Sequence, residues 1–301
     1  MQPPGGKPGG VNVHAAWRMA VAARAAQAYA GNGKLAALTV AGSVGAGLAD
    51  RFSDLELDCY WSSPPSDADR TGPIDALGGE LTDFWEYDPG DQEWSEQYLV
   101  GDLAVTISNF TTRTIEQWLD DVVLNADTAP VKHMRLAALQ RSRPLIGAEL
   151  ITSWRARAGN FPRELASALV QQALDPEELA GWAARDALVS RGDDLAARVL
   201  LIRAGQAAVR AVLAVNRAYL PHPLIKWQHH LITGLELVPE RLAERLESVS
   251  ASPPAEAFRA AEALLEDTTA LAEAHTGADL SSFRRALAER RPPLEPPAAG
   301  Q

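Results

Sequence analysis

The pattern of apolar and polar residues near the start of the chain predicts a small β-sheet. Residues 35–41 form a run of small, apolar and β-branched side chains, and residues 55–61 alternate apolar with acidic or polar ones. Both patterns are typical of strands. Residues 97–108 contain two further apolar segments separated by Gly101 and Asp102, which predicts a β-hairpin.

Apolar residues three and four positions apart precede and follow these strands, and they dominate the rest of the chain. This spacing predicts helices over 13–30 and 113–125, a long helix over 195–219, and two helices within 242–288. Little strand signal remains after residue 151. Most of the second half is therefore expected to be helical.

We expect an α+β fold with two domains. A small mixed sheet and its covering helices occupy residues 13–143, and an all-helical domain occupies residues 144–290, after a bend at 143–147. Residues 1–12 and 291–301 are rich in proline and small residues, so we expect them to be disordered.

A glycine-rich turn joins the first two predicted strands. Gly42, Gly45 and Gly47 allow backbone conformations that other residues avoid, and they let a phosphate approach main-chain N–H groups. Ser43 adds a hydroxyl at the start of a predicted helix, whose first N–H groups lack intrahelical partners. This turn is a candidate phosphate site.

Three acidic residues follow at alternate positions of the second strand. Asp54, Glu56 and Asp58 share one face of that strand because successive side chains point to opposite faces. Three negative charges in a row repel one another, and a cation relieves that repulsion. Hard oxygen ligands suit Mg²⁺, which takes one or two carboxylates and completes its shell with water and phosphates.

The combination resembles the signature of the DNA polymerase β nucleotidyltransferase superfamily. In that signature a Gly-Ser pair and a helix precede Ser-Asp-x-[Asp/Glu], and residues 53–56 have the order Ser-Asp-Leu-Glu, ten residues after the pair Gly42-Ser43. The alternative is an ordinary turn between strands followed by a solvated acidic edge.

The resemblance implies Mg²⁺-dependent transfer of a nucleoside monophosphate from a triphosphate, ATP first among the candidates, to an acceptor hydroxyl, with release of pyrophosphate. It implies that Asp54 and Glu56 are catalytic and hold the metal. It also implies that Gly42, Ser43 and Ser53 bind the nucleotide.

One position departs from the superfamily pattern. Members place a third carboxylate on a later strand between two apolar residues, and the matching triplet here is Val105-Thr106-Ile107. Asp54 and Glu56 could still hold one Mg²⁺ together with nucleotide phosphates, and Asp58 or Asp102 could substitute. The second hypothesis is therefore a nucleotide-binding regulator or antitoxin-like module that has lost catalysis. A third hypothesis is a helical protein that serves only for interaction, in which the N-terminal half is a structural relic.

The second half resembles the helical C-terminal domain of a largely uncharacterised family of bacterial nucleotidyltransferases, whose architecture antibiotic adenylylating enzymes share. The matching segments share their order along the chain and include Pro144-Leu145, Trp154-Arg155, Phe161-Pro162, Arg191-Gly192-Asp193, 216–221 and Lys226-Trp227. The resemblance implies that Arg217 and Lys226 bind the triphosphate and that Asp193 is a general base or an acceptor contact. Helix capping is the alternative for Asp193, and capping or a surface charge for Arg217.

Two other segments carry open alternatives. Residues 81–98 interleave aromatic and acidic side chains, which could frame a pocket for a cationic group or form cross-strand pairs with solvated charges. Residues 62–79 contain Pro64-Pro65, so we expect a loop, from which Arg70 could reach a phosphate or project into solvent.

Composition narrows the choice of partners. The chain has 39 acidic and 28 basic residues, a net charge of −11, which disfavours nonspecific nucleic-acid binding and favours a cationic or neutral acceptor. The single cysteine, Cys59, is expected to be a buried apolar side chain. With no signal-peptide or membrane-spanning pattern, these features favour the cytoplasm. The sequence leaves the oligomeric state open, a homodimer included.

Overall fold

The computed structural model describes residues 12–294 and divides into two compact units. The first contains the residues up to 125 together with 129–160, and the second contains 126–128 and the residues from 161 onward. The fold is α+β, as the sequence predicts. The predicted disorder of 1–12 and 291–301 lies outside the described residues, apart from Asn12, which caps the first helix, and 291–294.

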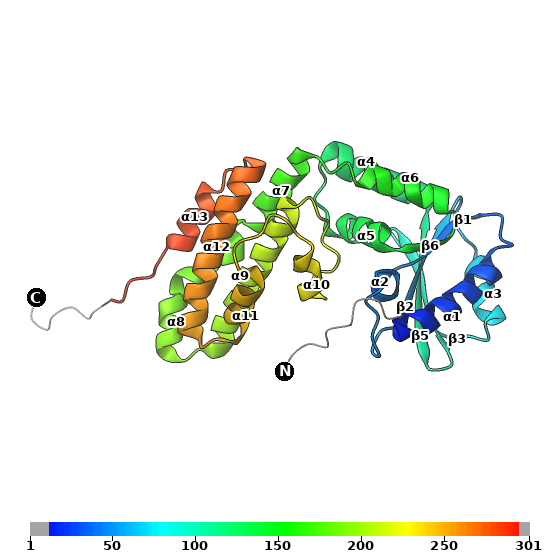
Figure 1. Cartoon of the computed structure of the whole chain (residues 1–301), viewed down its shortest axis with the longest axis horizontal. Helices are drawn as coiled ribbons and strands as arrows, with labels where there is room; N and C mark the ends of the chain where they lie inside the picture. The colour runs from blue at the N-terminus through cyan, green and yellow to red at the C-terminus, as the bar shows by residue number, and fades with distance from the viewer. Residues whose placement is uncertain (1–11, 295–301) are drawn as a thin grey trace, which may run out of the picture. The chain divides into compact units, whose positions relative to one another are not determined.

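The first unit is built on a six-stranded mixed sheet with the order β3-β4-β5-β2-β1-β6 (Figure 1). Strands β2 and β5 are parallel, and every other neighbouring pair is antiparallel. The strands are β1 (Leu35–Val40), β2 (Leu55–Trp61), β3 (Glu80–Asp88), β4 (Glu93–Val100), β5 (Leu103–Thr111) and β6 (Arg143–Ile146).

Helices cover this sheet. They are α1 (Val13–Tyr29), α2 (Gly42–Gly45), α3 (Asp67–Ala76), α4 (Thr112–Asn125), α5 (Pro130–Arg141) and α6 (Ala148–Ala158). Helix α1 begins at Asn12, whose side chain accepts hydrogen bonds from the N–H groups of His14 and Ala15. Helices α1 and α3 lie together on one side of the sheet (Figure 1).

The two faces of β2 have different surroundings. Leu55, Leu57 and Cys59 belong to the core cluster that also contains apolar residues of α1 and α3. Glu56 and Asp58 therefore project from the opposite face, because side chains alternate along a strand. Cys59 is fully buried, as predicted.

The boundary between the units lies later than the expected one at 143/144. Residues 143–146 form β6, which pairs with β1, and they do not form the predicted bend. Helix α6 then packs on the same unit, where Trp154 meets Tyr60 edge to face with 5.2 Å between ring centroids. These contacts keep the chain in the first unit as far as residue 160.

Helix α3 occupies part of the segment expected to be a loop. Ser66 caps it: the Ser66 hydroxyl accepts a hydrogen bond from the N–H of Asp69, and the Asp69 carboxylate accepts one from the N–H of Ser66. The Pro64-Pro65 pair precedes this cap and so does not interrupt the helix.

The second unit is helical throughout its regular elements. They are α7 (Arg163–Ala173), η1 (Pro176–Leu179), η2 (Trp182–Ala184), α8 (Arg185–Arg191), α9 (Asp194–Val215), α10 (Gln228–Thr233), α11 (Leu242–Ala251), α12 (Pro254–Thr276) and α13 (Ser281–Ala288). Helix α9 is central to its core and contacts α7, α11 and α12.

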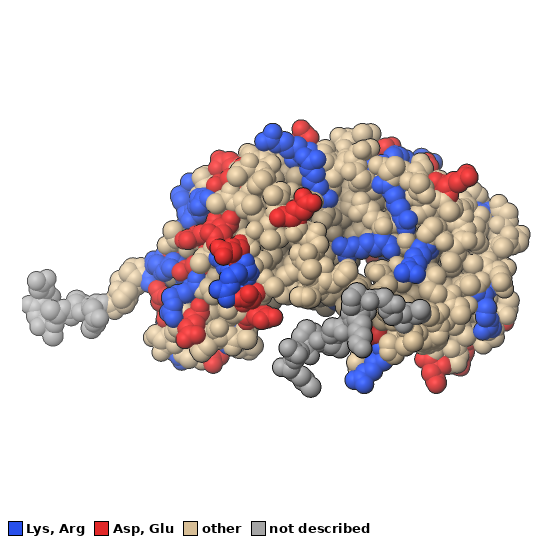
Figure 2. Space-filling view, in the orientation of Figure 1, with Lys and Arg blue, Asp and Glu red and all other residues tan. Residues whose placement is uncertain are grey.

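Charges on the outer helices of this unit are mixed in sign. Figure 2 shows basic and acidic side chains interspersed on the visible face, and Arg284 pairs with Glu273 and Arg245 with Asp267. Within residues 12–294, no helix is both long and apolar enough to span a membrane.

Candidate functional site

A cavity of about 710 Å³ opens on the face of the first unit's sheet that carries Glu56 and Asp58. Strands β2 and β5, the β3–β4 hairpin and helix α5 all contribute to its walls. The residues that line it are Asp54, Glu56, Leu57, Asp58, Trp85, Glu86, Tyr87, Asp88, Pro89, Asp91, Glu93, Ser95, Thr106, Ser108 and Arg135.

The two predicted metal ligands lie together in this cavity. Asp54 immediately precedes β2 and Glu56 is the second residue of that strand; both are exposed to solvent and both line the cavity. The motif spacing therefore brings both carboxylates to one surface.

Glu56 also meets the glycine-rich turn. A Cβ atom added to Gly42, whose φ is +57°, would lie 2.5 Å from Glu56 Oε1, so the carboxylate rests directly against the backbone of this glycine. Gly42 begins the one-turn helix α2, and the half-buried Ser43 follows it. The turn and the acidic strand thus share a surface.

The third position of the superfamily pattern lies where the resemblance implies. Strand register pairs Thr106 with Glu56 and Ser108 with Asp58 on the neighbouring parallel strand. Thr106 lines the cavity, so a threonine stands in the position expected for a third carboxylate. Of the two suggested substitutes, Asp58 lines the cavity, whereas Asp102 lies in the β4–β5 turn and does not.

Asp58 and Glu93 are unusually buried acids. Burial raises the pKa of the Asp58 carboxyl, while the nearby Arg135 guanidinium acts in the opposite direction. Burial also raises the pKa of Glu93 to about 7, with further increases from the charges of Asp58 and Asp91. Both groups are therefore protonated more readily than surface carboxylates.

Arg135 is already engaged with other side chains. Its guanidinium forms an ion pair with Glu93, lies 4.9 Å from the ring centroid of Phe110, and is 3.4 Å from the Ser108 hydroxyl. Among the described residues, Arg135 is the one basic residue that lines the cavity, and seven of the other lining residues carry carboxylates. The lining of the cavity is therefore predominantly acidic.

The aromatic and acidic segment forms strands, and its tip lines the cavity. Trp85 and Tyr87 of β3 are about half exposed at the wall, and Tyr87 packs against Trp94 of β4 with 4.6 Å between centroids. The cross-strand pairing is thus confirmed, and four acids of the same segment, Glu86, Asp88, Asp91 and Glu93, also line the cavity.

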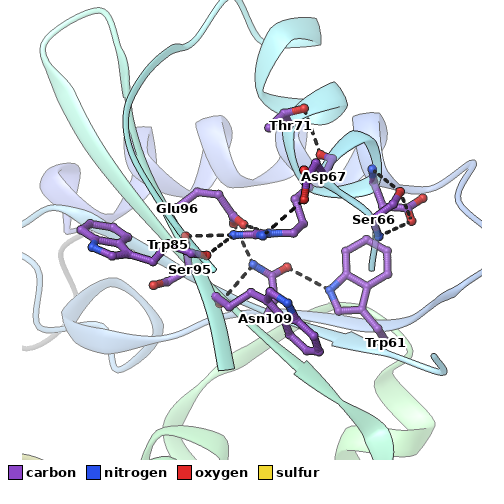
Figure 3. A network of polar contacts seen from close by, with 11 residues as sticks. Trp61, Ser66, Asp67, Thr71, Trp85, Ser95, Glu96 and Asn109 are labelled. Carbon is purple, nitrogen blue, oxygen red and sulfur yellow. Dashed lines mark hydrogen bonds and ion pairs between the residues drawn. The ribbon is translucent and has the colours of Figure 1, made fainter. Parts of the chain in front are cut away.

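A buried polar network holds this hairpin to α3 (Figure 3). Arg70 is fully buried, pairs with the buried Glu96, and donates to the carbonyl oxygens of Trp85 at 2.6 Å and Ser95 at 3.1 Å. Glu96 also accepts a hydrogen bond from Asn109 at 2.7 Å. Both predictions for Arg70, a phosphate contact and a solvated side chain, are wrong, because the guanidinium is enclosed within the first unit.

Helix α1 fixes the loop that leads into Asp54. The Asn12 amide donates to the carbonyl oxygens of Gly47 and Ala49, and Arg18 donates to that of Ser53. The Ser53 hydroxyl bonds with Asp50, and Ser53 does not line the cavity. Ser53, predicted to bind nucleotide, thus shapes the approach to Asp54 in this structure.

The three predicted residues of the helical half lie in the second unit. Asp193 stands at the N-cap position of α9, although its side chain caps no N–H group of that helix. Arg217, with φ of +54°, and Lys226 lie beyond the end of α9, and all three side chains are exposed. Their proposed roles stay predictions.

The acidic pair suits one type of metal site. Within residues 12–294, no group of three or more His, Cys, Asp or Glu residues is placed to hold a metal ion. An all-protein cage is therefore absent from this part of the chain. Asp54 and Glu56 fit Mg²⁺, because that ion uses one or two carboxylates and takes its remaining ligands from phosphates and water.

Parts of the chain are similar to known proteins. Residues 130–228 match the model of a domain of unknown function (DUF4037). A search of curated proteins finds no match. Among solved structures, the chain is similar to a nucleotidyltransferase-like protein from Exiguobacterium sibiricum 255-15, at 12% identity and a TM-score of 0.41, covering 86% of this chain and 78% of that one. Likeness at this level assigns no function.

Proposed function

We propose that the first unit binds a nucleoside triphosphate with Mg²⁺ and transfers the nucleoside monophosphate to an acceptor hydroxyl. The observation that carries this proposal is the meeting of Glu56 with the Gly42 turn, beside Asp54 in one cavity. A phosphate-binding turn and a pair of magnesium ligands on one surface are the parts that nucleotide chemistry requires. ATP is the expected nucleotide.

Each part of the site has a role in this reaction. Asp54 and Glu56 would hold the cation, and backbone N–H groups at Gly42 and Ser43 would contact phosphate oxygens. Bound Mg²⁺ supplies charge neutralisation for the triphosphate. The acceptor hydroxyl oxygen would attack the α-phosphorus and form a new O–P bond as its proton passes to water, while the bond to the leaving oxygen breaks and pyrophosphate departs with its electron pair.

Charge explains why binding should depend on the cation. The lining carries seven carboxylates and one arginine that is paired with Glu93, so a free triphosphate would be repelled. A divalent ion held by Asp54 and Glu56 would offset this repulsion. The same negative lining favours a neutral or cationic acceptor over an anionic one.

Thr106 favours a second candidate, a module that binds nucleotide without turning it over. This residue stands beside Glu56 in the position where the superfamily pattern has a carboxylate. A hydroxyl cannot replace the charge of a carboxylate at a metal, so the site has fewer anionic ligands than the pattern implies. The nucleotide would then act as a signal and not as a substrate.

An assay with labelled nucleotide separates the two candidates. The full chain is incubated with each α-labelled nucleoside triphosphate, Mg²⁺ and a small-molecule cell extract, and pyrophosphate and new labelled products are separated. Transfer predicts labelled products that vanish in Asp54→Asn with Glu56→Gln. Nucleotide binding without products from the wild-type chain, and turnover gained in Thr106→Asp, would support the binding module instead.

A further inference from the structure

Arg143 lies beside the glycine-rich turn, although it is distant from that turn in the sequence. It is the first residue of β6 and pairs across the sheet with Val40, the last residue of β1. The chain enters the turn directly after Val40 and Ala41. The sheet thus brings an arginine next to the segment expected to contact phosphates.

One nitrogen of the guanidinium is anchored on the turn. Arg143 Nε donates a hydrogen bond of 3.1 Å to the carbonyl oxygen of Gly45. A Cβ atom added to Gly47 would lie 3.3 Å from Arg143 Nη2, and Gly47 has a φ of +75°. A glycine at position 47 therefore leaves room for the guanidinium to lie against the backbone.

The remaining nitrogens of this guanidinium are available. Within residues 12–294 the structure gives Nη1 and Nη2 of Arg143 no hydrogen-bond acceptor and no carboxylate partner, and the residue is exposed. Three other arginines of the first unit differ: Arg70 and Arg135 are paired with glutamates, and Arg155 donates to the carbonyl oxygens of Leu139 and Ser142. Arg143 thus presents two directed donors beside the turn.

We propose that Arg143 binds the terminal phosphates of the nucleotide held at the Gly42–Gly47 turn. This inference rests on the proposed function, because it requires a nucleoside triphosphate in that site. A guanidinium offers parallel donors whose geometry matches two phosphate oxygens, and its charge persists at all physiological pH values. The Gly45 contact holds the side chain in place and so reduces the entropy lost on binding.

Charge supports this assignment. A nucleoside triphosphate with one Mg²⁺ keeps a net negative charge, and the only basic side chain among the described residues that line the cavity is that of Arg135, which is paired with Glu93. Arg143 adds positive charge on the side of β1 opposite β2, away from the acidic wall. It would therefore select for the β- and γ-phosphates and contribute little to the binding of a monophosphate.

Equilibrium dialysis of the full chain with radiolabelled ATP and AMP, both in Mg²⁺, tests the proposal. Arg143→Gln should weaken ATP binding by about tenfold or more, the loss expected for hydrogen bonds to a charged group, and change AMP binding by less than about twofold. Arg143→Lys keeps the positive charge but lacks the parallel donors of a guanidinium, so its ATP affinity should lie between those of the wild-type chain and Arg143→Gln. Arg157→Gln is the matched control, because Arg157 is a partly exposed arginine of the same unit that pairs with Asp120.

The outcomes separate the inference from the proposed function. Equal ATP affinity in Arg143→Gln and Arg157→Gln would overturn the role of Arg143 while leaving nucleotide binding intact. Equal losses for ATP and AMP would also overturn it, because Arg143 would then only shape the turn through Gly45. If the wild-type chain binds no ATP, the proposed function itself fails.

Discussion

Glu93 carries the clearest pH dependence at the scale of single residues. Its pKa is raised from 4.5 to about 7, first by burial, so the native state holds this proton more tightly than the unfolded chain does. The resulting stabilisation is complete below about pH 4.5 and is lost as the pH rises through about 7. Unfolding free energy should therefore decrease across this window.

Replacing Glu93 by Gln removes this titration. At about 1.36 kcal/mol per pKa unit, the native chain should lose up to about 3 kcal/mol between acidic and mildly basic pH, and Glu93→Gln should lose distinctly less. Urea unfolding at about pH 5 and about pH 8 measures how much unfolding free energy each protein loses between the two pH values. An equal loss of unfolding free energy in the native chain and in Glu93→Gln would contradict the assigned pKa.

Arg70 gives a prediction about stability. Arg70→Met leaves the buried Glu96 without its cationic partner, which should lower the free energy of unfolding in urea by about 3–5 kcal/mol. The exposed pair of Lys34 with Asp69 is the control, and Lys34→Met should cost less than about 1 kcal/mol. A small effect at Arg70 would mean that the hairpin does not depend on this network.

The sequence motif identifies some site residues and cannot identify others. Asp54, Glu56 and Gly42 lie within fifteen residues of one another, so local spacing predicts their proximity, and the structure brings them together. Arg143 and Arg135 reach the same region through strand pairing and helix packing. No local pattern encodes such long-range contacts.

At the scale of elements, the turn between β1 and β2 depends on a glycine at position 42. Gly42→Ala places an alanine where the backbone is left-handed, a conformation that only glycine adopts readily. Its Cβ atom would also collide with the Glu56 carboxylate. Mg²⁺-dependent ATP affinity should fall about tenfold, as when the partners of a metal ligand are disturbed. Gly33→Ala, with open space around it, is the control for this dialysis measurement. Unchanged affinity in Gly42→Ala would place the phosphates elsewhere.

Elements with strong local signals were predicted well. β1, β2 and the β4–β5 hairpin match their apolar patterns, and α1 and α4 match their helical spacing. The sequence predicts a loop in place of helix α3, because Pro64-Pro65 are typical of a loop; these prolines precede the helix, which begins at the capping box of Ser66 and Asp69. β6 was missed because four residues carry too little periodicity, and only their pairing with β1 makes them a strand.

At the scale of the whole molecule, the two units have separate hydrophobic cores. One core cluster lies within residues 15–146 and the other within residues 170–287. A ligand that binds in the first unit's cavity should therefore slow amide exchange first in that unit, at 40–48 and 54–58. Amides of the α9–α12 core should change little. Hydrogen exchange with and without ATP and Mg²⁺ measures this, and protection confined to the second unit would contradict the proposed site.

Isothermal titration of the full chain with each nucleoside triphosphate tests the central claim most directly, namely that Asp54 and Glu56 share a divalent ion with phosphates at the Gly42 turn. We predict binding of at least one triphosphate, ATP first, in Mg²⁺ but not with chelator, and its loss in Asp54→Asn with Glu56→Gln. Silence with every triphosphate in Mg²⁺, or undiminished binding by the double variant, would contradict the account.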